Sequence, residues 1–145
     1  MFKHALWGLV GLLGCSLPLS AGEKLKVVGT TSMVTDLVRS VAGEKAQVDG
    51  LMGPGVDPHL YKPTASDVLL LQRAQVIFYN GLLLEGKMTD VFIKLARSKR
   101  HVYAVTEEVS VDELMQPEEF AGHYDPHLWF DVQLWAKCVQ TVQNG

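Results

Sequence analysis

Gln75-Val76-Ile77-Phe78-Tyr79-Asn80 is the stretch that decides the fold of this chain. Apolar residues follow one another here without the alternation of a half-exposed strand, and β-branched and aromatic side chains dominate. Such a run predicts a strand that is covered on both faces, which is the situation of strands inside a parallel sheet.

Helical patterns lie on both sides of this run. The preceding helix is predicted to begin after Thr64, because Thr64 and Asp67 have the spacing of a capping box. Its expected buried side chains are Val68, Leu69, Leu70 and Leu71. The following helix is expected to extend through Ser98 on a stripe of Leu84, Met88, Val91, Phe92 and Leu95.

Three further strands are predicted over residues 25–30, 46–52 and 101–105. A helix over 33–42, capped by Thr31 or Ser32 and ended by Gly43, separates the first two. Strand and helix therefore alternate through residue 105. This order predicts an α/β protein with a parallel sheet of about four strands and helices on both faces.

The last part of the chain departs from this alternation. Residues 106–125 are acidic and predict a long surface loop. Asp131 then stands where it can cap a final helix. The apolar residues of that helix are Val132, Trp135, Val139 and Val142.

Residues 1–22 have the pattern of a secretory signal peptide. Lys3 gives a basic start, residues 5–14 form an uncharged apolar run, and residues 20–22 are small enough for cleavage before Glu23. The apolar run is too short for a membrane-spanning helix. Residues 23–145 are therefore expected to form the mature, exported chain.

A second interpretation shares this segment. Leu12-Leu13-Gly14-Cys15 is similar to a bacterial lipobox, in which a lipid on Cys15 would anchor the protein to a membrane. After residue 22 the chain has 12 Lys and Arg against 16 Asp and Glu, a formal charge of −4, which argues against nucleic acid as a partner. Cys138 is then the only cysteine, so no intrachain disulfide is expected.

The tripeptide Asp-Pro-His occurs twice and is the strongest chemical signal. Each proline stiffens the backbone just before its histidine, which lets a loop aim an imidazole at a fixed point. His59 and His127 are therefore predicted to converge on one divalent transition metal: zinc, manganese or iron. Nearby carboxylates are either further ligands or partners that orient the imidazoles. They are Asp57, Asp125 and Asp131.

Plainer interpretations remain for each of these residues. Asp131 is also explained as a helix cap, and His59 as a surface histidine. His123 is expected to be exposed, and His101 is expected to have a structural role at the start of a strand. Motifs for metalloprotease, serine hydrolase or phosphate-binding chemistry do not occur in the sequence. A metal-dependent enzyme using Asp131 or Asp57 remains an alternative.

Four spaced motifs carry a resemblance to a known family. They are Gly53-Pro54-Gly55-Val56-Asp57-Pro58-His59-Leu60-Tyr61, Pro63-Thr64 with its helix, Tyr79-Asn80-Gly81-Leu82 with Leu84-Glu85, and Asp125-Pro126-His127-Leu128-Trp129-Phe130-Asp131. With these motifs in this order, residues 25–143 resemble the zinc/manganese-specific solute-binding proteins of bacterial ABC transporters. The TroA-like members (cluster A-I) are the most similar.

The resemblance implies two α/β lobes joined by a long helix, with the metal between them. The N-terminal lobe of the family supplies two histidine ligands, which correspond here to His59 and His127. The C-terminal lobe supplies a His or Glu and an Asp. Residues 23–145 are expected to be the N-terminal lobe alone, so that the other lobe and its two ligands are absent from this sequence.

The resemblance also implies a function. It is extracytoplasmic capture of a divalent transition metal and delivery to an ABC permease, without catalysis. Many zinc-specific relatives have a histidine-rich loop where residues 106–125 contain only His123, which favours manganese, iron or mixed specificity. Apolar surface left by a missing lobe would favour self-association. The alternative is a surface or adhesion lipoprotein with incidental metal affinity.

Overall fold

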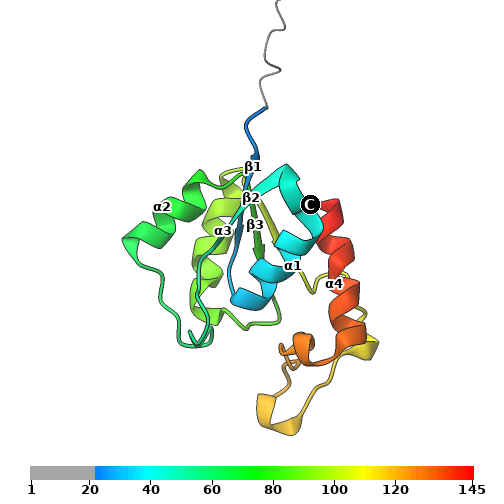
Figure 1. Ribbon diagram of the computed structural model, residues 1–145. Coiled ribbons are helices and arrows are strands. Elements are labelled where there is room, and N and C mark those ends of the chain that lie inside the picture. Colours follow the sequence, from blue (N-terminus) through cyan, green and yellow to red (C-terminus); the bar gives the residue numbers. More distant parts are fainter. Residues whose placement is uncertain (1–21) are drawn as a thin grey trace, which may run out of the picture.

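The structure is a computed structural model that describes residues 22–145, and its centre is a parallel sheet (Figure 1). The strands are β1 (Leu25–Gly29), β2 (Ala46–Gly50), β3 (Val76–Tyr79) and β4 (His101–Ala104), in the order β2-β1-β3-β4. All three strand pairs are parallel. The predicted four-stranded parallel sheet is confirmed, and the carboxyl ends of its strands meet at one edge.

Helices cover both faces of the sheet, as predicted (Figure 1). They are α1 (Ser32–Ala42), α2 (Ala65–Arg73), α3 (Thr89–Arg97) and α4 (Val132–Asn144). Val27 and Phe78 point to the face covered by α1 and α4. Val28 and Ile77 point to the face covered by α2 and α3. Neighbouring residues of one strand are thus buried in two separate cores, which explains the continuous apolar sequence.

Three helices begin at side-chain caps that the sequence predicts. The Thr31 hydroxyl accepts the Val34 N–H at the start of α1. Thr64 and Asp67 form the reciprocal capping box of α2. Asp131 Oδ1 accepts the N–H groups of Gln133 and Leu134 at the start of α4. These caps satisfy backbone donors that a helix leaves unpaired in its first turn.

Two residues predicted to be buried in helices are exposed. Leu69 is 51% exposed, because it lies about 200° around α2 from the fully buried Leu71. Val132 is 80% exposed. It is the first residue of α4, ahead of the part of that helix that packs on the core from Leu134 onward.

The predicted helix over residues 84–98 begins later than expected. Leu82 and Leu83 have positive φ angles of 51° and 63°, so the chain turns sharply after β3 before α3 begins at Thr89. Leu84 and Met88 are nevertheless fully buried in the turn. The apolar pattern predicted burial correctly, but it did not distinguish a helix from a buried turn.

Residues 106–125 form the irregular segment that the sequence predicts. It contains two short 3₁₀ turns, Val111–Glu113 and Glu118–Phe120, and it leads to a third, Leu128–Phe130, before α4. Figure 1 shows this segment extending beyond the edge of the sheet. Within residues 22–145, no helix is long and apolar enough to cross a membrane. The predicted signal peptide and the lipobox at Cys15 lie outside the described residues.

Candidate metal centre

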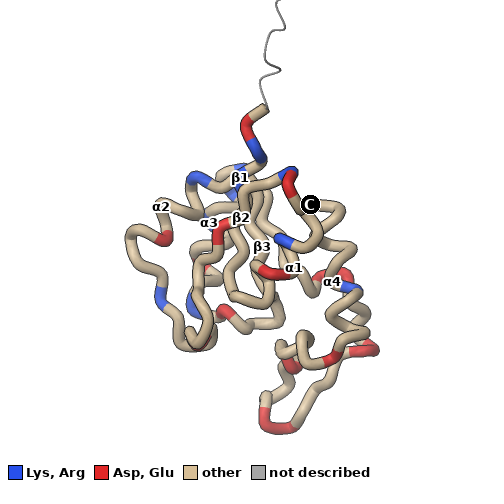
Figure 2. The backbone as a smooth tube through the Cα atoms, viewed as in Figure 1, with Lys and Arg blue, Asp and Glu red and all other residues tan. Residues whose placement is uncertain are grey.

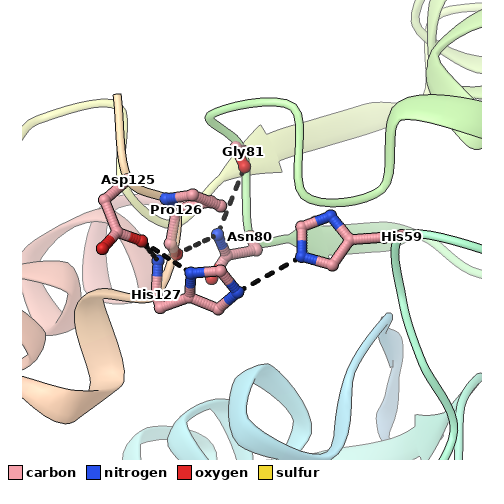
Figure 3. Close-up of polar contacts among 6 residues, drawn as sticks. All are labelled: His59, Asn80, Gly81, Asp125, Pro126 and His127. Carbon is pink, nitrogen blue, oxygen red and sulfur yellow. Dashed lines mark hydrogen bonds and ion pairs between the residues drawn. The ribbon is translucent and has the colours of Figure 1, made fainter. Parts of the chain in front are cut away.

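The two Asp-Pro-His loops meet at the carboxyl edge of the sheet. His59 lies in the loop between β2 and α2, and His127 directly precedes the Leu128–Phe130 turn. Their Nε2 atoms lie 3.2 Å apart, and their ring centroids are 5.3 Å apart (Figure 3). The structure therefore brings together the two histidines that the sequence singled out.

Both loops have the same local turn. Asp57 Oδ1 accepts the backbone N–H of His59 at 2.9 Å, and Asp125 Oδ1 accepts the backbone N–H of His127 at 3.0 Å. An aspartate that bonds the N–H two residues later closes an Asx turn, and the intervening proline restricts the backbone to it. The repeated tripeptide is thus a repeated device for presenting an imidazole.

The two aspartates differ in their relation to the imidazole rings. Asp125 Oδ1 also lies 2.6 Å from His127 Nδ1 (Figure 3). Burial would raise the pKa of Asp125, but the hydrogen bonds from the backbone and ring of His127 hold that pKa below its ordinary value. A carboxylate on Nδ1 favours the tautomer with the proton there, which leaves the Nε2 lone pair directed at His59.

The third aspartate has a structural role. Asp131 Oδ1 is occupied as the cap of α4. Its side chain also borders a hollow of about 320 Å³ together with His127, Asp125 and Glu113. Among residues 22–145, no group of three or more His, Cys, Asp or Glu side chains is placed so that it could hold a metal ion. The candidate centre of the described chain therefore consists of two imidazoles.

Sequence reasoning gave no role to a buried polar layer beneath His127. Asn80 follows β3 directly, and its Nδ2 donates to the carbonyl oxygens of Pro126 at 2.9 Å and Gly81 at 3.2 Å (Figure 3). Thr106 Oγ1 donates to the Asn80 carbonyl at 2.8 Å. Gly81 is required at this turn, because its φ is 91° and a Cβ would lie 2.6 Å from Thr106 Oγ1.

Glu85 supports this layer from below. Glu85 is only 3% exposed, and its Oε1 accepts the Thr30 hydroxyl at 2.6 Å and the Asn80 N–H at 2.8 Å. Burial raises the pKa of Glu85 despite these hydrogen bonds. The sequence does contain a signal for this layer. A lone Glu in an apolar turn and an Asn directly after a buried strand are both expected to be buried, and buried polar side chains need hydrogen-bond partners.

Aromatic side chains surround His127 but leave the centre open. Trp129 packs edge-on against the His127 ring at 5.2 Å between centroids. Phe130 is 81% exposed, so it does not shield the imidazoles from water. Tyr61 donates to Asp67 at 2.7 Å, and burial together with this bond raises the pKa of Tyr61 to about 12. It thereby ties the His59 loop to α2.

The two remaining histidines of the described chain lie elsewhere. His123 is exposed in the irregular segment, as predicted. His101 starts β4, and its Nδ1 lies 3.3 Å from the Tyr103 hydroxyl, in keeping with a structural role.

Charge is unevenly distributed over the molecule. Residues 106–131 contain eight Asp and Glu and no Lys or Arg. Figure 2 shows a group of acidic residues on the segment that extends beyond the sheet, at the end of the molecule away from the start of β1. A cluster of one sign raises the local concentration of counter-ions, here cations.

Comparison with known proteins identifies the family. The protein-family model described as "ZnuA: Zinc-uptake complex component A periplasmic" matches residues 27–145. The chain belongs to this family. The predicted resemblance to metal-specific solute-binding proteins is thereby confirmed.

Alignments with individual members of the family extend over most of the chain. The chain is 49% identical over 126 residues to "Zinc-binding protein TroA" of Treponema pallidum, covering 87% of the chain and 40% of that protein. It is 40% identical over 146 residues to "Manganese-binding lipoprotein MntA" of Bacillus subtilis, covering 99% of the chain and 47% of that protein. The chain thus spans less than half the length of these relatives.

The solved structures agree with the sequence comparison. The periplasmic zinc-binding protein TroA from Treponema pallidum superimposes with a TM-score of 0.75 at 48% identity, over 83% of this chain and 43% of that one. Zn(II)-bound AdcA from Streptococcus pneumoniae superimposes with a TM-score of 0.72 at 29% identity, over 84% and 25%. The α/β fold is shared with these proteins.

Proposed function

We propose that this chain captures a divalent transition metal (zinc, manganese or iron) outside the cytoplasmic membrane for delivery to an ABC permease, with His59 and His127 as metal ligands. The observation that carries the proposal is the Nε2–Nε2 distance of 3.2 Å. Two imidazole nitrogens bound to one tetrahedral zinc at 2.0–2.1 Å lie about 3.3 Å apart. The pair therefore has the spacing of two imidazoles that chelate one metal ion.

Two further observations support this role. Asp125 on Nδ1 of His127 is the arrangement that directs the other nitrogen of an imidazole toward a metal. The acidic residues of 106–131 attract cations to the same end of the molecule. The family and the names of the relatives, which include zinc-binding and manganese-binding proteins, agree with metal as the cargo.

The proposal includes the organisation of the chain. Residues 1–22 would direct export, with Cys15 as a site of lipid attachment if the lipobox is used. Residues 23–145 would form an N-terminal metal-binding lobe. Two imidazoles fill only half of a four-coordinate shell, so ligands from outside this pair would complete it.

Self-association is the second part of the proposal. Leu60, Met115 and Phe130 are large apolar side chains at 64%, 65% and 81% exposure, and Phe130 lies 6.5 Å from the His127 ring between centroids. A second copy of the chain could cover this surface and contribute ligands. Sedimentation velocity with and without zinc tests this, and a monomer under both conditions would argue against it.

The metal site is tested by titrating zinc and manganese separately into the purified protein in a calorimeter. His59→Ala and His127→Ala are each expected to lower the affinity by about 100-fold or more, which corresponds to about 2.7 kcal/mol. His123→Ala is the matched control, because it removes an exposed histidine of the same chain. Binding by either ligand variant as tight as that of the parent would disprove the shared site.

A further inference from the structure

The peptide group between Pro126 and His127 is held at both of its ends. Its carbonyl oxygen accepts Asn80 Nδ2 at 2.9 Å, and its N–H donates to Asp125 Oδ1 at 3.0 Å. Peptide groups are planar, and none of the described peptide bonds is cis, so these two bonds point in opposite directions from one rigid plane. Fixing that plane fixes the N–Cα bond of His127, and the Phe130 N–H, which donates to the His127 carbonyl at 3.2 Å, restrains the remaining rotation about that bond. Together these contacts set the direction in which the Cα–Cβ bond of His127 leaves the backbone.

Asn80 is itself immobilised. Its side chain is fully buried, and its two amide hydrogens both go to carbonyl oxygens, those of Pro126 and Gly81. Its backbone N–H donates to Glu85, and its backbone carbonyl accepts the Thr106 hydroxyl. Because both facing groups are acceptors, only the nitrogen of the amide can face them, and the orientation of the side chain is unique.

The His59 loop has no equivalent anchor in residues 22–145. The N–H of His59 is bound by Asp57, but none of the described hydrogen bonds reaches the Pro58 carbonyl. His59 is exposed, whereas Pro126 is buried and His127 is partly buried. The buried amide therefore acts on one of the two imidazoles only.

We propose that Asn80 is a positioning residue for metal capture: through the Pro126 carbonyl it holds His127 in the orientation in which Nε2 meets the metal. Asn80 does not touch the metal, and Glu85 and Thr106 keep it in place. The proposal rests on the proposed function, because it assigns Asn80 to the same two-histidine centre. It also gives a role to the Asn-Gly turn after β3, which the metal ligands alone leave unexplained.

The first test compares two variants that each remove a buried hydrogen bond, one at Asn80 and one away from it. Asn80→Ala removes the bond to Pro126 and is expected to weaken zinc and manganese binding by about 10- to 100-fold, the usual cost of losing a group that orients a ligand. Thr35→Val removes a buried hydrogen bond, the one to the Gly29 carbonyl, that does not involve Asn80, and it is expected to change the affinity by less than about twofold. Equal losses of affinity in both variants, or none in Asn80→Ala, would overturn the proposal.

Ring-nitrogen NMR adds a readout that general destabilisation does not move. In the metal-free parent, His127 is expected to carry its proton on Nδ1. Asn80→Ala is expected to mix the two tautomers of His127 while leaving the spectrum of His101, which lies outside the centre, unchanged. A His127 spectrum identical to that of the parent would count against Asn80 as the positioning group.

Amide hydrogen exchange tests the idea without any substitution, in case Asn80→Ala does not fold. The His127 N–H is expected to exchange more slowly than the His59 N–H, although both donate to an Asx-turn aspartate. Equal exchange rates would refute the anchoring of His127. If the parent binds no metal, the proposed function fails, and the exchange comparison still decides whether Asn80 anchors the loop.

Discussion

The two Asp-Pro-His loops have the same sequence and the same turn, but they are held differently. In the His59 loop the aspartate binds a backbone N–H, and the imidazole is exposed. In the His127 loop the aspartate also binds the ring, and Asn80 binds the proline carbonyl from a buried position. A tripeptide can specify a turn, but the rigidity of the residue it presents comes from distant contacts. If both histidines bind metal as proposed, His127 would be the ligand held in advance and His59 the ligand that can adjust.

The largest expected effect that separates the loops comes from their aspartates. Asp57→Ala and Asp125→Ala both remove an Asx-turn acceptor, but only Asp125→Ala also removes a carboxylate from an imidazole nitrogen. Asp125→Ala is expected to lower metal affinity by about 10- to 100-fold. Asp57→Ala is expected to cost no more than about threefold, since a surface turn contributes little once the ligand is bound. Calorimetric titration measures both, and equal losses would mean that the turn, rather than the ring contact, sets affinity.

The next effect concerns the helices that follow the loops. Thr64 caps α2 after the His59 loop, and Asp131 caps α4 after the His127 loop. Thr64→Ala and Asp131→Ala are each expected to lower the free energy of unfolding by about 1 kcal/mol. Urea denaturation measures this loss.

The same pair decides whether Asp131 also binds metal. If it acts only as a cap, both variants keep the affinity of the parent. A loss of affinity in Asp131→Ala alone, with Thr64→Ala unchanged, would add Asp131 to the ligands. That result would make the His127 side of the centre richer in ligands than the His59 side.

The two loops also show which features of the site could be predicted from the sequence and which could not. The turn and the proline restriction follow from local chemistry, and the repetition of the tripeptide predicted that His59 and His127 converge. The difference between Asp57 and Asp125 does not, because the tripeptides are identical and the ring contact depends on packing around His127. The partner of Asn80 was equally out of reach, since the bond from Asn80 to Pro126 spans 46 positions of the chain.

The fold shows the same division. Strand positions, caps and both covered faces were predictable from apolar pattern and capping residues. The start of α3 was not, because Leu82 and Leu83 take left-handed backbone conformations that leucine rarely adopts. The buried turn that follows places Glu85 beneath Asn80, so the part of the fold that sequence reasoning missed is the part that anchors His127.

The smallest expected effect is the contribution of Glu85 to the pH dependence of the free energy of unfolding. Glu85 binds the backbone of Asn80, which in turn holds the His127 loop. Burial raises its pKa above the ordinary 4.5, so the folded protein holds this proton more tightly than the unfolded chain. The stabilisation is therefore fully present below about pH 4.5 and is lost as the pH rises through the higher folded pKa.

Glu85→Gln replaces the carboxyl group with an amide that does not titrate, so this variant is the reference for the pH dependence of stability. The parent is expected to lose stability relative to Glu85→Gln as the pH rises above about 4.5, measured by urea denaturation at several pH values. Glu119→Gln removes an exposed carboxylate and controls for the change in net charge. If Glu85→Gln and Glu119→Gln differ from the parent by the same amount at every pH, Glu85 is not a buried acid in solution. The anchor of His127 would then be as open to water as the loop that presents His59.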